Sequence, residues 1–238
     1  MTTILLLPGL ACDAALFREQ LPALAAAGHR VQVSDVHTRA PTLPAMAAAL
    51  LAEHPGRLAL AGCSMGGMLA LEVWRQAPAR VAALALLGTT ARADTPELLR
   101  LRSDAIGLFE QGRMDEVLRA NVGFAFHPAH AADAALVADY LAMVQRAGAA
   151  QLIAQDRAVM ARADLRALLP AVACPTLVMV GADDALTPPE HAREIAAAVP
   201  GATLVVLARC GHMLSWEQPA QVTSALRDWA ARLSVAPA

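Results

Sequence analysis

The stretch LALAGCSMGG at residues 58–67 decides the fold class. Its first four residues are apolar on both faces, as in a buried strand, and an apolar helical pattern runs from Gly66 to Gln76. Between them, residues 62–66 match the G-x-S-x-G pattern in the strand–turn–helix context that it requires. Such a tight turn strains the serine backbone, and small residues two before and two after allow it to form. We therefore expect the Ser64 hydroxyl at the carboxyl edge of a sheet, over a helix N-terminus that stabilises negative charge.

The rest of the chain alternates short apolar runs with longer helical patterns. Strands are expected at residues 3–7, 30–34, 58–62, 81–87, 176–180 and 203–207. Helices are expected at residues 14–27, 43–53, 66–76, 189–198 and 219–233. This alternation predicts an α/β fold, with a mainly parallel sheet and helices on both of its faces.

One segment, residues 91–169, breaks the alternation and contains no strand-like run. Its helical pattern is interrupted near Gly107, Gly112, His127-Pro128 and Gly148. A helical insert between two buried strands indicates a cap over one end of the sheet. The predicted organisation is a core domain of residues 1–90 and 170–238, with a helical cap of residues 91–169 inserted in it. The few large residues expected to hold this alanine-rich cap down are Phe109, Phe124, Phe126 and Tyr140.

A serine hydroxyl is a weak nucleophile unless a base takes its proton. His212 follows the last predicted strand, on a loop after Gly211, where it can lean over the same edge of the sheet. Four other histidines lie in turns or at helix ends, where we expect solvent exposure: His29, His37, His54 and His191. An acid that orients the base should follow another strand. Asp183 and Asp184 both do so, and their position alone leaves open which of them faces the histidine.

An acyl-transfer site also needs two backbone N–H donors for the developing oxyanion. Met65, directly after the serine, is expected to supply one. The loop that follows residues 3–7 should supply the second, and we assign it to the Leu10 N–H. Pro8 has no N–H to donate, and Gly9 permits the loop conformation.

Composition excludes several classes of protein. Charged residues make up only 17% of the chain and the formal net charge is −2, so no nucleic-acid-binding face is expected. No lysine occurs, which rules out a P-loop and a Schiff-base enzyme. No uncharged apolar run reaches the roughly 18 residues of a membrane span. The four cysteines are too scattered for a zinc site, and no metal or organic cofactor is implied. Without the positive region of a signal peptide, a cytoplasmic protein with reduced thiols is expected.

Further motifs resemble a known family. They are residues 62–68, residues 87–91 with 95–97, Cys174-Pro175-Thr176, residues 181–184 with Thr187-Pro188, and Gly211-His212 with residues 217–219. Over nearly its whole length the chain resembles the capped α/β-hydrolases, and within them the small bacterial group around 3-oxoadipate enol-lactonases and related esterases. In that family the catalytic aspartate lies four residues before the proline. The resemblance therefore implies the triad Ser64, Asp184 and His212. Relatives usually carry His-Gly where this chain has Pro8-Gly9.

These features predict a serine hydrolase that cleaves a small-molecule carboxylic ester, lactone or thioester through an acyl-enzyme. The alternatives within the fold are C–C bond hydrolysis of a ring-cleavage product, and acyl transfer or perhydrolysis. A non-catalytic ligand receptor is a remote alternative from another class. The nine arginines of residues 91–169 could recognise an acidic substrate, or they are solvated helix residues. The sequence leaves the oligomeric state open.

Overall fold

Six parallel strands form a single sheet in the computed structural model of the protein, which describes residues 2–234. The strands are β1 (Thr3–Leu7), β2 (Arg30–Val33), β3 (Leu58–Cys63), β4 (Val81–Leu87), β5 (Thr176–Gly181) and β6 (Thr203–Leu207). Their order across the sheet is β2-β1-β3-β4-β5-β6, and every neighbouring pair is parallel. All six predicted strands are confirmed to within one residue at either end.

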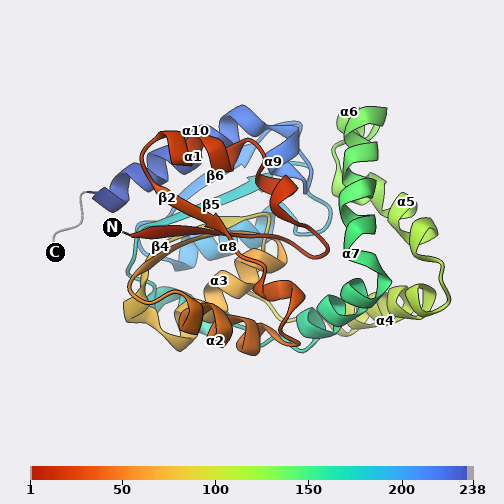
Figure 1. Ribbon diagram of the computed structural model, residues 1–238, viewed down its shortest axis with the longest axis horizontal. Coiled ribbons are helices and arrows are strands. Elements are labelled where there is room, and N and C mark those ends of the chain that lie inside the picture. The colour runs from red at the N-terminus through yellow and green to blue at the C-terminus, as the bar shows by residue number, and fades with distance from the viewer. Residues whose placement is uncertain (1, 235–238) are drawn as a thin grey trace.

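Helices cover both faces of the sheet (Figure 1). One face carries α1 (Gln20–Ala26) and α10 (Pro219–Ala231), and the other carries α2 (Leu43–Glu53), α3 (Met65–Gln76) and α8 (Pro189–Ala198). Successive strand residues alternate between the two cores: Leu6 packs in the core that contains α10, and Leu7 in the core that contains α3. The inner strands β1, β3, β4 and β5 are buried on both faces and are almost entirely apolar. The edge strands β2 and β6 are partly exposed.

The prediction of one continuous helix at residues 14–27 is wrong. The structure has a short 3-10 turn at Ala14–Phe17 and then α1 from Gln20 onwards. Pro22 explains the break, because a proline inside a helix has no N–H to donate and clashes with the carbonyl four residues earlier. A new start at Gln20 places Pro22 in the first turn of α1, where both problems disappear.

The segment between β4 and β5 is helical, as predicted. It contains α4 (Pro96–Glu110), α5 (Met114–Ala125), α6 (Pro128–Ala131) and α7 (Ala134–Met160), which lie together beside one end of the sheet (Figure 1). Helices end near Gly112 and His127, and α7 is broken at Gly148, whose φ is 76°. The interruption expected at Gly107 is wrong, since α4 runs through it. The domain boundaries at residues 91 and 169 stay a prediction.

Three of the four expected anchors of these helices are buried: Phe109, Phe126 and Tyr140. The ring of Phe126 packs edge-on against that of Tyr140, with centroids 5.3 Å apart. Phe124 is 56% exposed, so its expected role is wrong. Phe124 lies on the outward face of α5. The buried residues of this helix are Leu118 and Ala125.

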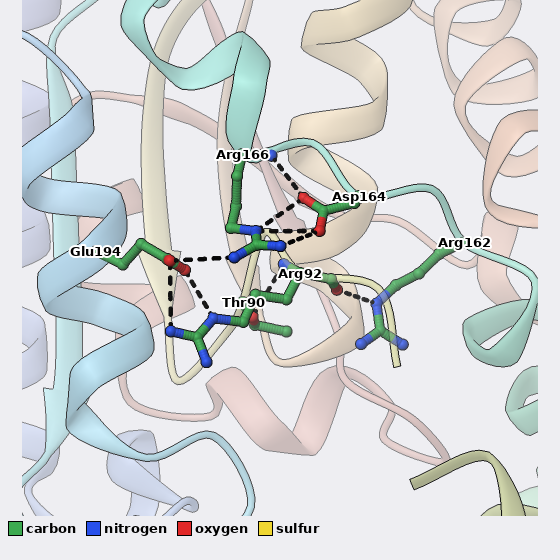
Figure 2. A network of polar contacts seen from close by, with 6 residues as sticks. All are labelled: Thr90, Arg92, Arg162, Asp164, Arg166 and Glu194. Atoms are coloured by element: carbon green, nitrogen blue, oxygen red, sulfur yellow. Dashed lines mark hydrogen bonds and ion pairs between the residues drawn. The ribbon is translucent and has the colours of Figure 1, made fainter. Parts of the chain in front are cut away.

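Ion pairs join the base of the insert to the core (Figure 2). Arg92, just after β4, pairs with Glu194 of α8 at 2.8 Å, and Arg166 pairs with the same carboxylate at 3.5 Å. The two crossings of the chain also contact each other directly. The Leu165 N–H donates to the Ala91 carbonyl at 2.8 Å, and the Arg162 guanidinium donates to the Arg92 carbonyl at 2.8 Å. The first and last residues of the insert therefore lie next to each other.

Candidate functional site

Ser64 lies between the end of β3 and the start of α3, at the turn that the sequence predicts. Its φ is +54° and its ψ is −118°, a combination that residues with a Cβ rarely adopt. The strained backbone is held by two hydrogen bonds: the Ser64 N–H donates to the Leu87 carbonyl at 2.9 Å, and the Thr89 hydroxyl donates to the Ser64 carbonyl at 2.7 Å. The Ser64 side chain does not cap the helix, so its hydroxyl is not used in holding the turn.

Gly62 and Gly66 permit this turn because their neighbours leave no room for a side chain. A Cβ at Gly62 would lie 2.1 Å from the Gly66 carbonyl oxygen, and one at Gly66 would lie 2.0 Å from the Leu7 carbonyl oxygen. Both contacts are with backbone atoms, which cannot move aside without distorting the sheet. The need for small residues on both sides of the serine is therefore steric.

His212 and Asp184 form a buried pair on loops that follow β6 and β5. Nδ1 of His212 lies 2.9 Å from Oδ2 and 3.1 Å from Oδ1 of Asp184, and the exposed fractions of the two residues are 7% and 3%. Asp183 is half-exposed and lies 4.0 Å from His127 instead. The structure thus brings His212 to Asp184 and not to Asp183. Within residues 2–234, no hydrogen bond joins His212 to Ser64.

Thr187 also contacts this pair, and the sequence analysis did not identify it. Its hydroxyl donates to Oδ2 of Asp184 at 2.9 Å, and its N–H and that of Leu186 both donate to Oδ1 at 2.9 Å. A threonine three residues after an aspartate, before a proline, is the only local signal for it. These donors fix the carboxylate and favour its ionised form.

The charge and hydrogen bonds of this pair shift both pKa values. Burial acts to raise the pKa of Asp184, but the charge and hydrogen bond of His212 and the Thr187 donors together hold it below its usual 3.8. Burial acts to lower the pKa of His212, but the Asp184 carboxylate and, more weakly, Glu217 raise it above 6.5. Because the carboxylate occupies the side of Nδ1, Nε2 is the nitrogen left to exchange a proton with a reacting group.

Of the two predicted oxyanion donors, Met65 is the first residue of α3 and Leu10 lies on the loop after β1. A Cβ at Gly9 would lie 3.3 Å from the Cβ of Ser64, so the loop after β1 passes directly against the serine. In the described part of the chain, neither the Leu10 nor the Met65 N–H donates a hydrogen bond to another residue. Both groups are therefore available to an acceptor placed next to the serine.

The other histidines and the arginines differ in part from expectation. His37 is buried, so its expected exposure is wrong: its Nε2 donates to the Cys12 carbonyl at 2.9 Å. Most of the arginines in residues 91–169 pair with carboxylates of this chain. The pairs involve Arg92, Arg102, Arg113, Arg146, Arg157, Arg162 and Arg166. These pairings leave little support for recognition of an acidic substrate by the insert.

Two cavities lie away from these residues. A groove of about 910 Å³ runs between α1 and α10, and a cavity of about 100 Å³ lies under the base of the insert beside Met68 and Thr90. Neither is lined by Ser64, Asp184 or His212, so neither volume describes this site. Within residues 2–234, no three His, Cys, Asp or Glu side chains are grouped to hold a metal ion. Over the same range, no helix is long and apolar enough to cross a lipid bilayer.

Known proteins share both the sequence and the fold. The alpha/beta hydrolase fold family matches residues 2–219. RutD of Variovorax paradoxus, provisionally named a carbamate hydrolase, is 30% identical over 247 residues, covering 97% of this chain and 92% of its own. A thermophilic esterase from Thermogutta terrifontis is 29% identical with a TM-score of 0.88, covering 98% of this chain and 90% of its own. The enol-lactonase from Burkholderia xenovorans, at 23% identity and a TM-score of 0.87 over 97% and 91% of the two chains, shares the fold. The chain belongs to the alpha/beta hydrolase fold family.

Proposed function

We propose that the protein is a serine hydrolase that cleaves a small carboxylic ester, lactone or thioester through an acyl-enzyme. One observation carries the proposal: the buried Asp184–His212 pair follows β5 and β6, and Ser64 follows β3 in the same parallel sheet. The carboxyl ends of parallel strands share one edge. In this arrangement Ser64 can act as the nucleophile, His212 as the base and Asp184 as the acid that orients it.

In this mechanism the Ser64 hydroxyl attacks the carbonyl carbon while Nε2 of His212 takes its proton. Asp184 holds the imidazole in the required tautomer and stabilises the imidazolium that forms. The Leu10 and Met65 N–H groups bind the oxyanion of the tetrahedral intermediate. His212 then returns the proton to the departing oxygen or sulfur. Water, activated by His212, breaks the acyl-enzyme and regenerates Ser64.

The name of the Thermogutta relative favours a carboxylic ester as the substrate class. Carbamate hydrolysis, C–C bond hydrolysis, acyl transfer and perhydrolysis can use the same three side chains, so substrate trials must separate them. A panel of p-nitrophenyl esters, lactones, carbamates and ring-fission products should show ester or lactone turnover above the others. Dominant C–C bond cleavage would replace the proposal with that alternative.

The nucleophile is tested with a fluorophosphonate. It should label Ser64 and abolish turnover, and Ser64→Ala should lower kcat on the order of 10⁶-fold, because the triad acts as a unit. A matched control is Ser103→Ala, since Ser103 is an exposed serine of α4. Label on another residue, or full turnover in Ser64→Ala, would contradict the assignment.

A further inference from the structure

The loop after β1, which carries the proposed oxyanion donor, contains a strained residue. Ala11, next to Leu10, has a φ of +56° and is almost completely buried. The Cys12 N–H donates to the Gly9 carbonyl at 3.1 Å and closes a four-residue turn, in which Ala11 takes the third position. A positive φ at that position is normally adopted by glycine. An alanine remains there only when surrounding contacts hold it.

Two buried side chains supply those contacts. Oε1 of Gln155 accepts the Ala11 N–H at 2.7 Å, and Nε2 of His37 donates to the Cys12 carbonyl at 2.9 Å. Nε2 of Gln155 in turn donates to the His37 carbonyl at 2.9 Å. Because burial lowers the pKa of His37, its ring stays neutral near neutral pH, with the proton on Nε2 that this contact needs.

Gln155 reaches the loop from the inserted helices. It lies in α7 beyond the break at Gly148, 144 residues from Ala11 in sequence, and it is 1% exposed. An amide buried to this extent needs partners for its polar atoms, and Gln155 finds them on the loop after β1 and on the 3-10 turn Val36–Thr38. The Gln155 amide therefore serves contacts inside the protein and not with solvent. Its contacts link α7 to the loop that passes against Ser64.

We propose that Gln155 is a positioning residue of the oxyanion hole. Its amide fixes the Ala11 peptide and so the orientation of the neighbouring Leu10 N–H, which stabilises negative charge only if it is already aimed at the oxyanion. This inference rests on the proposed serine-hydrolase function. Because Gln155 belongs to α7, the oxyanion hole is complete only when that helix is seated on the core.

The test compares Gln155→Met, which keeps the shape and loses both hydrogen bonds, with Gln145→Met. Gln145 lies in the first half of the same helix and bonds Asp115 at an exposed position. Turnover of a p-nitrophenyl ester is measured per active site titrated with fluorophosphonate, and binding of a boronic acid that forms a tetrahedral adduct is measured alongside. Gln155→Met should lower kcat about 10- to 100-fold with KM nearly unchanged, and should weaken boronate binding by a similar factor. Gln145→Met should change neither.

Two further variants separate positioning from general damage. Gln155→Asn keeps a polar side chain but is one methylene too short for the Ala11 N–H, so it should show the same loss in kcat even if Gln155→Met does not fold. Gln155→Glu retains an acceptor oxygen at full length and should keep more of kcat than Gln155→Asn. If the wild-type protein shows no turnover that depends on Ser64, the proposed function is overturned, and this inference with it. Ser64-dependent turnover that Gln155→Met and Gln155→Asn leave intact, or a loss confined to KM, overturns this inference alone.

Discussion

At the scale of single residues, the two adjacent aspartates have different surroundings. Asp184 accepts three hydrogen bonds from Leu186 and Thr187 and contacts His212, whereas the Asp183 side chain is half-exposed. Asp184→Asn should lower kcat about 10⁴-fold, because an amide favours the wrong histidine tautomer. Asp183→Asn is the matched control and should cost far less. Steady-state kinetics on the two variants decide the point, and a reversal of the two effects would exchange their roles.

The pH dependence of turnover follows from His212. Only its neutral form can accept the Ser64 proton, and the Asp184 carboxylate raises its pKa above 6.5. Turnover should therefore be present at high pH and be lost as the pH falls through a value above 6.5 in a profile of kcat/KM. In Asp184→Asn the residual activity should persist to lower pH, because the raising charge is gone. An acid limb that stays in place in Asp184→Asn would show that another group controls it.

Residue chemistry explains how far the site was predictable. Ser64 and His212 each follow a strand within a recognisable motif, so a linear pattern was enough to propose them. The choice of Asp184 over Asp183 needed the resemblance to the capped α/β-hydrolases. Gln155 is a single polar residue in a helical pattern, and its partner lies 144 residues away. No local signal encodes such a contact, because it depends on how α7 packs on the core. His37 was misplaced for the same reason.

At the scale of elements, the short helix α9 (Leu214–Glu217) joins the His212 loop to the insert through Glu217. The carboxylate of Glu217 accepts the Gly211 N–H at 2.9 Å, the His127 N–H at 2.8 Å and Nδ1 of His130 at 2.8 Å. The His212 and Met213 N–H groups also donate to the Ala125 carbonyl of α5. The loop that carries the proposed base, His212, is thus held by hydrogen bonds to residues of both the core and the insert.

Glu217→Ala should therefore affect both stability and turnover. Three donors would lose their buried acceptor, which should lower the free energy of unfolding by roughly 3 kcal/mol. The looser His212 loop should also lower kcat, measured per titrated active site. Glu116→Ala is the control, since Glu116 forms an exposed pair with Arg113, and it should leave both quantities nearly unchanged. Equal effects in the two variants would contradict a special role of Glu217.

The elements themselves were largely predictable because the pattern of the strands is strong. Residues 58–63 and 176–181 are buried throughout, and such apolar runs bounded by glycine have few alternatives to a parallel strand. The errors in the predicted helices occurred where a single residue is compatible with two structures, as a glycine can either end a helix or lie within one. Gly107 is half-buried within α4, where a glycine is tolerated at a cost of about 1 kcal/mol, so it did not end the helix.

At the scale of the whole molecule, the inserted helices differ in how firmly they are attached. In α4 the buried residues are Ile106 and Phe109, whereas the second half of α7 buries Leu152, Gln155, Asp156, Ala158 and Val159. Local opening is easiest where few side chains are buried. We therefore expect α4 and α5 to open more readily than α7 and the sheet.

Hydrogen exchange measures this difference. Amides of α4 and α5 should exchange faster than those of the strands around Leu60, Leu86 and Val178, and the second half of α7 should exchange at an intermediate rate. Binding of an active-site inhibitor should slow exchange in the insert if those helices move to admit substrate. Uniform protection across insert and sheet would remove the idea of such an opening.

The contact between the two crossings has an evolutionary consequence. The Leu165 N–H donates a hydrogen bond to the Ala91 carbonyl, so the insert begins and ends at neighbouring points. Any segment whose ends meet at that spacing can replace it without disturbing the strand order, and loop-closure entropy changes only slowly with its length. Natural variation can thus replace the insert as a unit. Selection on the proposed hydrolase activity can then act on the insert while the strands keep their sequence.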